Sequence, residues 1–141
     1  MAKNIIIDTG FWYAFYDKRD GHHEDAGILI DEISSHNLIV PWPSLYETLN
    51  TRFVRRSQWL DSFENYLKKK NIHIVSDEDY RDFAFKNLWI LNRLKNNSYS
   101  LVDIVIRCMI EDENLRINAL LTFNPSDFHD VCYRNSVEIL W

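Results

Sequence analysis

Ile5-Ile6-Ile7-Asp8 is the segment of this sequence that points most directly to a fold. Three consecutive β-branched residues predict a short strand that is buried on both faces, as in a parallel sheet. A carboxylate follows at the end of that strand. In open parallel sheets, ligands bind beyond the carboxyl ends of the strands, so Asp8 is placed for chemistry. The alternative role is capping of the next turn, because Asp is a common residue at such positions.

The composition is that of one folded domain. The chain has 141 residues, of which 46% are hydrophobic and 14% aromatic, and this is enough to bury a core. We find no linker or repeat, and we expect a single domain over residues 1–141. Charged residues interrupt the longest apolar segment, 101–110, and the amino terminus has no basic and apolar leader, so we expect a cytoplasmic protein without a membrane span. Cys108 and Cys132 lie in apolar segments and are expected to be reduced core residues.

The charge pattern is weakly informative about a nucleic-acid partner. The net charge of −5 argues against a broad basic surface, although metal-binding carboxylates would also lower the net charge of a nuclease. Arg52, Arg55 and Arg56 form a local basic cluster that is a candidate RNA-binding patch. A solvated helix face is the simpler interpretation of the same residues.

Hydrophobic periodicity predicts strands that alternate with helices. The predicted strands are 5–7, 38–40, 72–75, 119–123 and 137–140. The predicted helices are 23–33, Pro43-Ser44 through Phe53, 57–70, Ser76 to Leu91, Ser100 to Ile110 and a further one after Asn124-Pro125, with a break at Asn96-Asn97-Ser98. This alternation favours an α/β layer fold with a mostly parallel sheet and right-handed crossovers.

Two acidic residues lie at the starts of predicted helices. Glu47 follows Ser44 by three residues, and Asp103 follows Ser100 by the same spacing. This spacing is that of a capping box, in which the serine caps the helix and the acid bonds back to the cap amide. Asp103 has a further structural alternative, an ion pair with Arg107 one turn later. Its flanks are almost entirely apolar, however, and a carboxylate there is costly unless it is paired or bound to a metal.

Asn124 and Asp127 follow the fourth predicted strand. Asp127 lies in the first turn of the next helix, where the helix dipole also favours an acid. In a doubly wound sheet, the strand ends and the starts of the following helices share one edge, so Asp8, Glu47 and Asp103 are expected to meet there. Carboxylates on one edge repel each other unless a cation lies among them, and hard oxygen ligands suit Mg²⁺ or Mn²⁺. Such ions activate water and stabilise the charge that develops on a phosphate.

The ordered set of motifs resembles the four motifs of PIN-domain ribonucleases, most closely the VapC-type toxins of type II toxin–antitoxin systems. The matching segments are Ile5-Ile6-Ile7-Asp8-Thr9, Pro43 to Glu47, Ser100 to Asp103 and Leu121 to Phe128. The resemblance covers essentially the whole chain in motif order, spacing and length. It implies a three-layer α/β/α PIN-like domain with a five-stranded sheet in the order 3-2-1-4-5. It also implies a metal-dependent endoribonuclease that acts on RNA with Mg²⁺ or Mn²⁺, forms a homodimer and is inhibited by a cognate antitoxin protein.

The resemblance also assigns roles to residues. Asp8, Glu47, Asp103 and Asp127 are the implied catalytic acids, Asp8, Asp103, Glu47 and Asn124 the implied metal ligands, and Thr9, Ser100 and Thr122 the hydroxyl residues that would orient carboxylates or contact substrate. At the fourth acidic position the family often has Asp where this chain has Asn124. The fourth ligand is therefore the Asn124 carbonyl, Asp127 or neither, and a neutral ligand would weaken binding of a second metal.

Other reaction classes fit the sequence less well. Phosphoryl transfer of the haloacid-dehalogenase kind needs a second acid two residues after Asp8, where this chain has Gly10. The three glycines are not grouped into a phosphate-binding loop, and the serines, cysteines and five histidines lack the spacing of a nucleophile or a metal site. The serious alternative is a PIN-like module that binds RNA or a protein without cutting, and Asn124 favours it.

Two aromatic features complete the sequence-based expectations. The run from Phe11 to Tyr16 cannot all face inward from one helix. We therefore expect at least one of Trp12, Tyr13 and Tyr16 to lie at a dimer or antitoxin interface, and burial of all three would contradict this. His22-His23 predicts a solvated helix start, with substrate contact as a secondary role.

Overall fold

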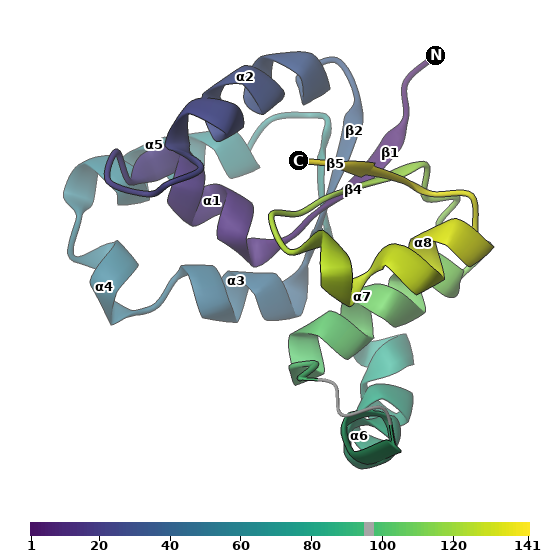
Figure 1. The fold of residues 1–141 in the computed structure, drawn as a ribbon. Helices are drawn as coiled ribbons and strands as arrows, with labels where there is room; N and C mark the ends of the chain where they lie inside the picture. Colours follow the sequence, from purple (N-terminus) through teal and green to yellow (C-terminus); the bar gives the residue numbers. More distant parts are fainter. Residues whose placement is uncertain (95–97) are drawn as a thin grey trace.

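A computed structural model describes residues 1–94 and 98–141 of the chain, and the break expected at Asn96-Asn97 lies outside the described residues. The strands are β1 (Asn4–Ile7), β2 (Asn37–Pro41), β3 (Ile72–Val75), β4 (Ala119–Leu121) and β5 (Glu138–Leu140) (Figure 1). The helices are α1 (Thr9–Tyr16), α2 (His23–Ile33), α3 (Trp42–Thr48), α4 (Thr51–Val54), α5 (Ser57–Leu67), α6 (Glu78–Leu94), α7 (Leu101–Glu111) and α8 (His129–Arg134), with a 3₁₀ helix η1 (Pro125–Asp127).

The strands form one sheet in the order β3-β2-β1-β4-β5, and every pairing is parallel. This confirms the expected order and PIN-like fold class. β1 lies at the centre, where Ile6 pairs with Ile39 of β2 and with Leu120 of β4. Because side chains alternate along a strand, Ile5 packs on one face of the sheet and Ile6 on the other, and both are fully buried. The short β-branched run thus anchors both halves of the core.

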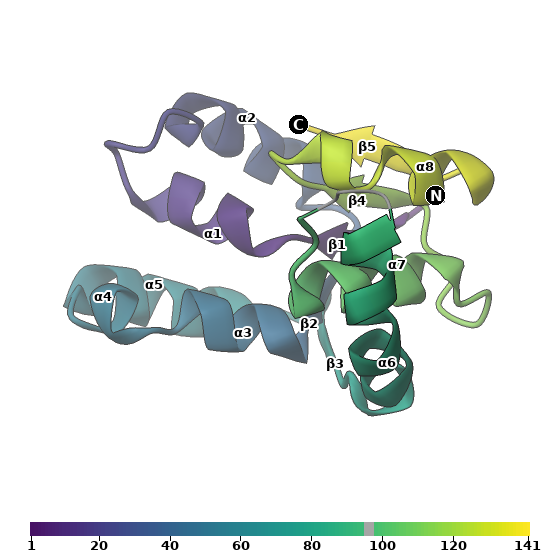
Figure 2. The ribbon, with the colours of Figure 1, turned by 60° about the horizontal axis from the view of Figure 1, so that its bottom comes forward.

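Helices cover both faces of the sheet, so the domain has three layers (Figures 1 and 2). On one face, Trp12 of α1 and Phe63 of α5 are fully buried and their rings lie 4.8 Å apart. On the other face, Ile106 of α7 and Phe128 belong to the second half of the core. α7 is central, as its apolar sequence predicted, although Leu101 in its first turn is exposed.

The segment after β2 differs from the expected single helix. Leu49 does not continue the buried face begun by Leu45, because the chain leaves the helix there and Leu49 is 38% exposed. Asn50 then caps a separate short helix, α4, by accepting a hydrogen bond from the Phe53 amide at 3.1 Å. Phe53 reaches the core from α4. The prediction of one helix through Phe53 is therefore wrong, although its buried residues Leu45 and Phe53 are correct.

Several element ends also differ from expectation. β4 ends at Leu121 rather than at residue 123, and α5 ends at Leu67 rather than at residue 70. The helix expected over Ser76 to Leu91 spans Glu78–Leu94. Lys68 is the carboxyl-terminal cap of α5, so the remaining lysines follow the helix. None of these differences changes which elements form the sheet.

The aromatic run from Phe11 to Tyr16 is only partly buried. Trp12 is fully buried, which excludes it from an interface. Tyr13 and Tyr16 are half-buried, so the prediction that one of these rings lies at an interface stays open.

The cysteines lie in apolar surroundings. Cys132 is buried and Cys108 half-buried, and burial raises the pKa of both thiols to about 11. Over residues 1–94 and 98–141, no helix combines the length and the apolarity needed to cross a membrane.

Candidate active site

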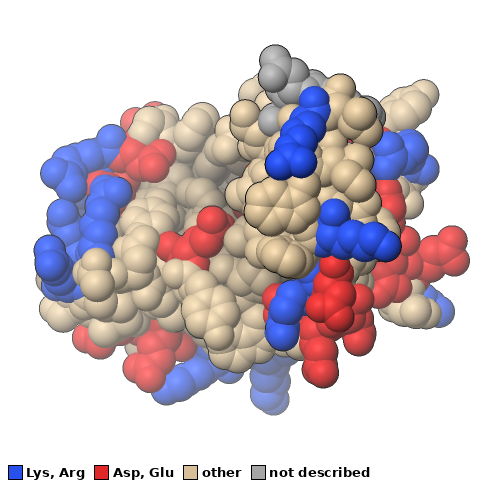
Figure 3. Space-filling view, turned by 90° about the horizontal axis from the view of Figure 1, so that it is seen from below, with Lys and Arg blue, Asp and Glu red and all other residues tan. Residues whose placement is uncertain are grey.

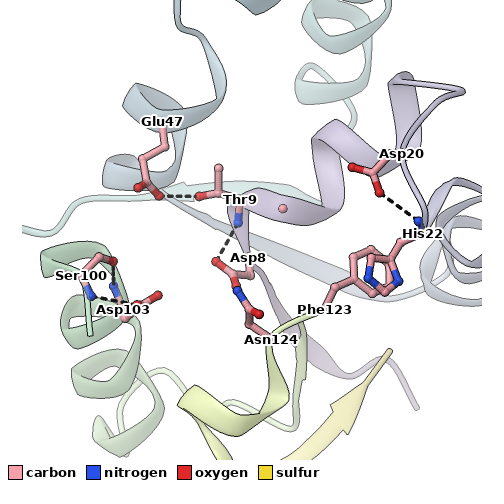
Figure 4. Close-up of a pocket in the computed structure, with 10 residues that line it drawn as sticks. Asp8, Thr9, Asp20, His22, Glu47, Ser100, Asp103, Phe123 and Asn124 are labelled. Atoms are coloured by element: carbon pink, nitrogen blue, oxygen red, sulfur yellow. Dashed lines mark hydrogen bonds between the residues drawn. The ribbon is translucent and has the colours of Figure 1, made fainter. Parts of the chain in front are cut away.

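A cavity of about 550 Å³ opens at the carboxyl edge of the sheet, between the two helical layers. Its lining residues come from segments far apart in the sequence (Figure 4): Asp8, Thr9, Gly10, Asp20, His22, Glu47, Ser100, Asp103, Phe123 and Asn124. Figure 3 shows acidic side chains in a hollow at the centre of this face, with Lys and Arg side chains towards its outer parts. The three acids expected to meet, Asp8, Glu47 and Asp103, thus share one cavity.

Asp8 both caps α1 and lines the cavity. Its Oδ1 accepts a hydrogen bond from the Thr9 amide at 2.8 Å, and its Oδ2 accepts one from the Thr122 hydroxyl at 2.8 Å. The capping role and the placement for chemistry, which are alternatives in the sequence, occur together. Thr122 is fully buried beneath the cavity, so this carboxylate is held from the core side.

The electrostatics of the cavity disfavour a negative charge on Asp8. Burial raises the pKa of Asp8 from 3.8 to about 6, although the hydrogen bonds from Thr122 and Thr9 lower it. The nearby charges of Asp103 and Glu47 raise the pKa further. Of the residues that the structure describes, no Lys or Arg lines the cavity. A cation placed among these carboxylates would therefore favour ionisation of Asp8.

Glu47 lies near the end of α3 and not in its first turn. α3 begins at Trp42 with Pro41 as its cap, so Ser44 is already inside the helix and cannot cap it. The Ser44 hydroxyl is buried without a hydrogen-bond partner in the described part of the chain. Glu47 instead accepts a hydrogen bond at its Oε1 from the Thr9 hydroxyl at 2.9 Å. The capping-box alternative for Glu47 is wrong, and this acid turns towards the first residue of α1.

Asp103 does form a capping box. The Ser100 amide donates to Asp103 Oδ2 at 2.9 Å, and the Asp103 amide donates to the Ser100 hydroxyl at 3.1 Å. The alternative ion pair with Arg107 does not form, because Arg107 makes two hydrogen bonds to Asp130 at 2.8 and 2.6 Å. The Asp103 carboxylate therefore lies at the cavity wall, on the first turn of α7 (Figure 4).

Of the two residues proposed for the fourth position, Asn124 lines the cavity and Asp127 does not. The Asn124 amide nitrogen of the main chain donates to the Thr122 hydroxyl at 3.0 Å, which ties this residue to the Asp8 support. Asp127 lies in η1, and burial followed by the charge of Asp103 raises the pKa of its carboxyl group. Asp127 is thus close enough to Asp103 to feel its charge, but it is not one of the lining residues.

The donor set suits a hard divalent cation. Carboxylate and amide oxygens are the ligands that Mg²⁺ and Mn²⁺ prefer. Here such oxygens line one cavity, and the negative charges of Asp103 and Glu47 act unfavourably on that of Asp8. Within residues 1–94 and 98–141, however, no three His, Cys, Asp or Glu side chains are close enough together to hold one ion. The lining residues are therefore of the types that bind such a cation, but the side chains of the acids lie apart from one another around the cavity.

Four lining residues were not among the site residues assigned from sequence: Gly10, Asp20, His22 and Phe123. The ring centroids of His22 and Phe123 are 4.3 Å apart with an interplanar angle of 5°, so the rings are stacked. The histidine pair at residues 22 and 23 was a weak signal for substrate contact. No local pattern places Phe123, two residues beyond β4, against the loop between α1 and α2.

The fold and the cavity define a PIN-like α/β/α domain with an acidic site at the carboxyl edge of its sheet. Among solved structures, the chain is similar to VapC20 of Mycobacterium tuberculosis, described as a sarcin–ricin loop cleaving toxin. The TM-score is 0.67 and the identity 19%, over 89% of this chain and 94% of that chain. At this identity the likeness establishes a shared fold. No protein-family model and no curated protein matches the chain.

Proposed function

We propose that this protein is an endoribonuclease that hydrolyses RNA phosphodiester bonds with Mg²⁺ or Mn²⁺. The observation that carries the proposal is the convergence of Asp8, Glu47 and Asp103 on one cavity that lacks described Lys or Arg side chains. The shared fold with VapC20 supports the same reaction class. It also supports the further proposal that the chain is the toxin of a toxin–antitoxin pair.

The side chains divide into ligands and supports. Asp8, Glu47 and Asp103 would hold the cation, with the Asn124 carbonyl as the neutral fourth ligand in place of Asp127. Bound there, the cation would activate a water molecule and offset the negative charge that develops on the phosphate. Thr9, Thr122 and Ser100 each bond to one of the acids and would fix its orientation. The chain itself supplies position and charge, and no covalent intermediate is required.

Cleavage of RNA with added Mn²⁺ tests the proposal. Asp8→Asn keeps the size of the side chain and removes its charge, and we expect it to lower the cleavage rate at least about 100-fold, because loss of residues that merely support metal ligands already costs 10- to 100-fold. Asp61→Asn, at an exposed acid on α5, is the matched control and should cleave like the wild type. Equal cleavage by wild type and Asp8→Asn would contradict the mechanism.

A module that binds RNA or protein without cutting is the second candidate. Two observations favour it: the neutral Asn124 at the fourth position, and the separation of the acids among the described residues. RNA binding without cleavage by the wild-type protein in Mg²⁺ and in Mn²⁺ would establish this alternative.

The proposed toxin role implies three partners: an RNA substrate, a cognate antitoxin and a second copy of the chain. It also implies a cytoplasmic location. Exposed apolar side chains support protein partners, since Trp42 and Tyr46 of α3 are 44% and 79% exposed. For RNA, Arg55 and Arg56 are exposed, whereas Arg52 forms an ion pair with Asp17 at 3.0 Å. Arg52 is therefore better explained as structural, and the other two arginines stay candidates.

A further inference from the structure

One wall of the cavity is aromatic. His22 and Phe123 line the cavity together with Asp8 and Asn124, and their rings are stacked at 4.3 Å (Figure 4). We infer that this pair, the His22–Phe123 platform, binds one nucleobase of the RNA substrate by stacking on the outer face of His22. The role of the platform rests on the proposed ribonuclease function.

The side chain of His22 does not cap the helix that follows it. It is the amino-terminal cap residue of α2, but its side chain makes no capping hydrogen bond. Ser, Thr, Asp and Asn are the residues that cap well. The imidazole ring lies instead against Phe123, and its side chain remains 51% exposed. One face of the ring therefore stacks on Phe123, and the exposed part of the side chain contributes to the lining of the cavity.

The platform is held from behind and at its base. Phe123 packs against Phe11, which is fully buried, with ring centroids 6.4 Å apart. The Asp20 carboxylate accepts a hydrogen bond from the His22 amide at 2.9 Å. The His23 ring bonds to the Ala14 carbonyl at 2.8 Å, which ties the loop to α1. Such support pre-organises the rings, so stacking a base there costs little ordering of the protein.

The cavity is large enough for one nucleotide unit. Its volume of about 550 Å³ lies within the range of pockets that hold small organic ligands. If the carboxylates held a phosphate through a cation, a neighbouring base would lie in the cavity that the platform also lines. Stacking on aromatic rings accepts any base, because every base has a π-face, and single-stranded RNA presents unstacked bases. The platform would thus select unpaired RNA at the cleavage position.

The test measures binding of a short single-stranded RNA that carries 2-aminopurine, whose fluorescence is quenched on stacking. The protein is the full chain with Asp8→Asn, in Mg²⁺, so that the RNA is not cut. We expect His22→Ala to weaken binding about tenfold and to abolish the quenching, since one stacked base contributes on this scale. His22→Phe keeps a ring and should retain both. His73→Ala, at an exposed histidine on β3, is the matched control and should change neither.

The outcomes separate the platform from the nuclease. Unchanged binding and quenching in His22→Ala overturn the platform, even if the wild-type chain cleaves RNA. Loss of both in His22→Ala supports the platform, even if the wild-type chain cuts nothing. Recovery by His22→Phe shows that the ring is what matters, and failure to recover overturns the stacking role. No RNA binding by the parent protein overturns the platform as well.

Discussion

At the scale of the residue, Asp8 shows how a stability cost and a functional position coincide. Its carboxylate accepts two hydrogen bonds, yet burial raises its pKa to about 6. The two neighbouring acids raise it in the same direction. A neutral residue at this position would make the folded chain more stable. In the proposed nuclease, the acid would be kept for the cation that it holds, and not for its contribution to folding.

This cost predicts the pH dependence of stability. The folded chain binds the Asp8 proton more tightly than the unfolded chain, so the free energy of unfolding falls as pH rises through about 6. In the absence of divalent cations, Asp8→Asn should raise the free energy of unfolding at pH 7.5 by about 2–3 kcal/mol, since one pKa unit is worth about 1.4 kcal/mol. The gain should vanish below about pH 4, where both states are protonated.

Urea denaturation at a series of pH values measures this effect. Asp61→Asn removes an exposed charge on α5 and should change the free energy of unfolding by less than about 0.5 kcal/mol at every pH. A gain in Asp8→Asn that is the same at pH 4 and pH 7.5 would show that ionisation of Asp8 is not its cause.

At the scale of the element, the same serine-to-acid spacing of three residues occurs at α3 and at α7, but only one of the two forms a capping box. Ser100 and Asp103 form a capping box, whereas Ser44 and Glu47 do not. The difference lies in where each helix begins. α7 begins directly after Ser100, but α3 begins at Trp42, because the chain passes from β2 into the helix at Pro41. The start of a helix thus decides whether its acid caps the backbone or is free to turn towards another element.

α7 and α8 are joined by Arg107, which predicts a loss of stability on conservative substitution. Arg107 is 12% exposed and bonds to both Asp130 oxygens and to the Asp127 carbonyl. Arg107→Lys keeps the charge but cannot make the paired bonds, so the free energy of unfolding should fall by about 1–3 kcal/mol. Arg81→Lys, at an exposed i,i+4 pair with Asp77, should cost less than about 0.5 kcal/mol.

The Arg107 effect also has a defined pH window. Hydrogen bonding to Arg107 holds the pKa of Asp130 well below its usual range. The stabilisation is therefore full above about pH 4 and is lost gradually as pH falls from there through the folded pKa of Asp130, so the difference between wild type and Arg107→Lys should shrink in strong acid. Thermal unfolding at about pH 7 and about pH 2 checks this, and an equal difference at both would contradict the ionic origin.

At the scale of the whole molecule, α6 presents an apolar stripe that no described element covers. Phe83, Ile90 and Leu94 share one face of the helix and are 61%, 51% and 78% exposed. Large exposed apolar side chains in a contiguous set are typical of protein–protein contacts. The proposed homodimer would bury such a surface.

Charge on this stripe should therefore separate the proposed dimer. We expect the wild-type chain to sediment as a dimer and Ile90→Asp as a monomer with unchanged thermal stability of the fold. Ile28→Asp, at a 61% exposed position on α2, is the control and should remain dimeric. A dimer that survives Ile90→Asp would place the contact elsewhere, and a monomeric wild type would contradict the homodimer.

The sequence by itself determined that strands alternate with helices in a mostly parallel sheet and that Asp8, Glu47 and Asp103 meet. Local periodicity and turn residues specify the elements, and parallel strands bring their carboxyl ends to one edge. The strand order and the three layers were implied by the resemblance to PIN-domain ribonucleases and not by local patterns. Tertiary structure alone decided that Asn124 rather than Asp127 lines the cavity, that Glu47 bonds to Thr9, and that His22 stacks on Phe123. These contacts join residues far apart in the chain or depend on where a helix starts. Packing of whole elements against the sheet sets such positions, and no local spacing encodes them.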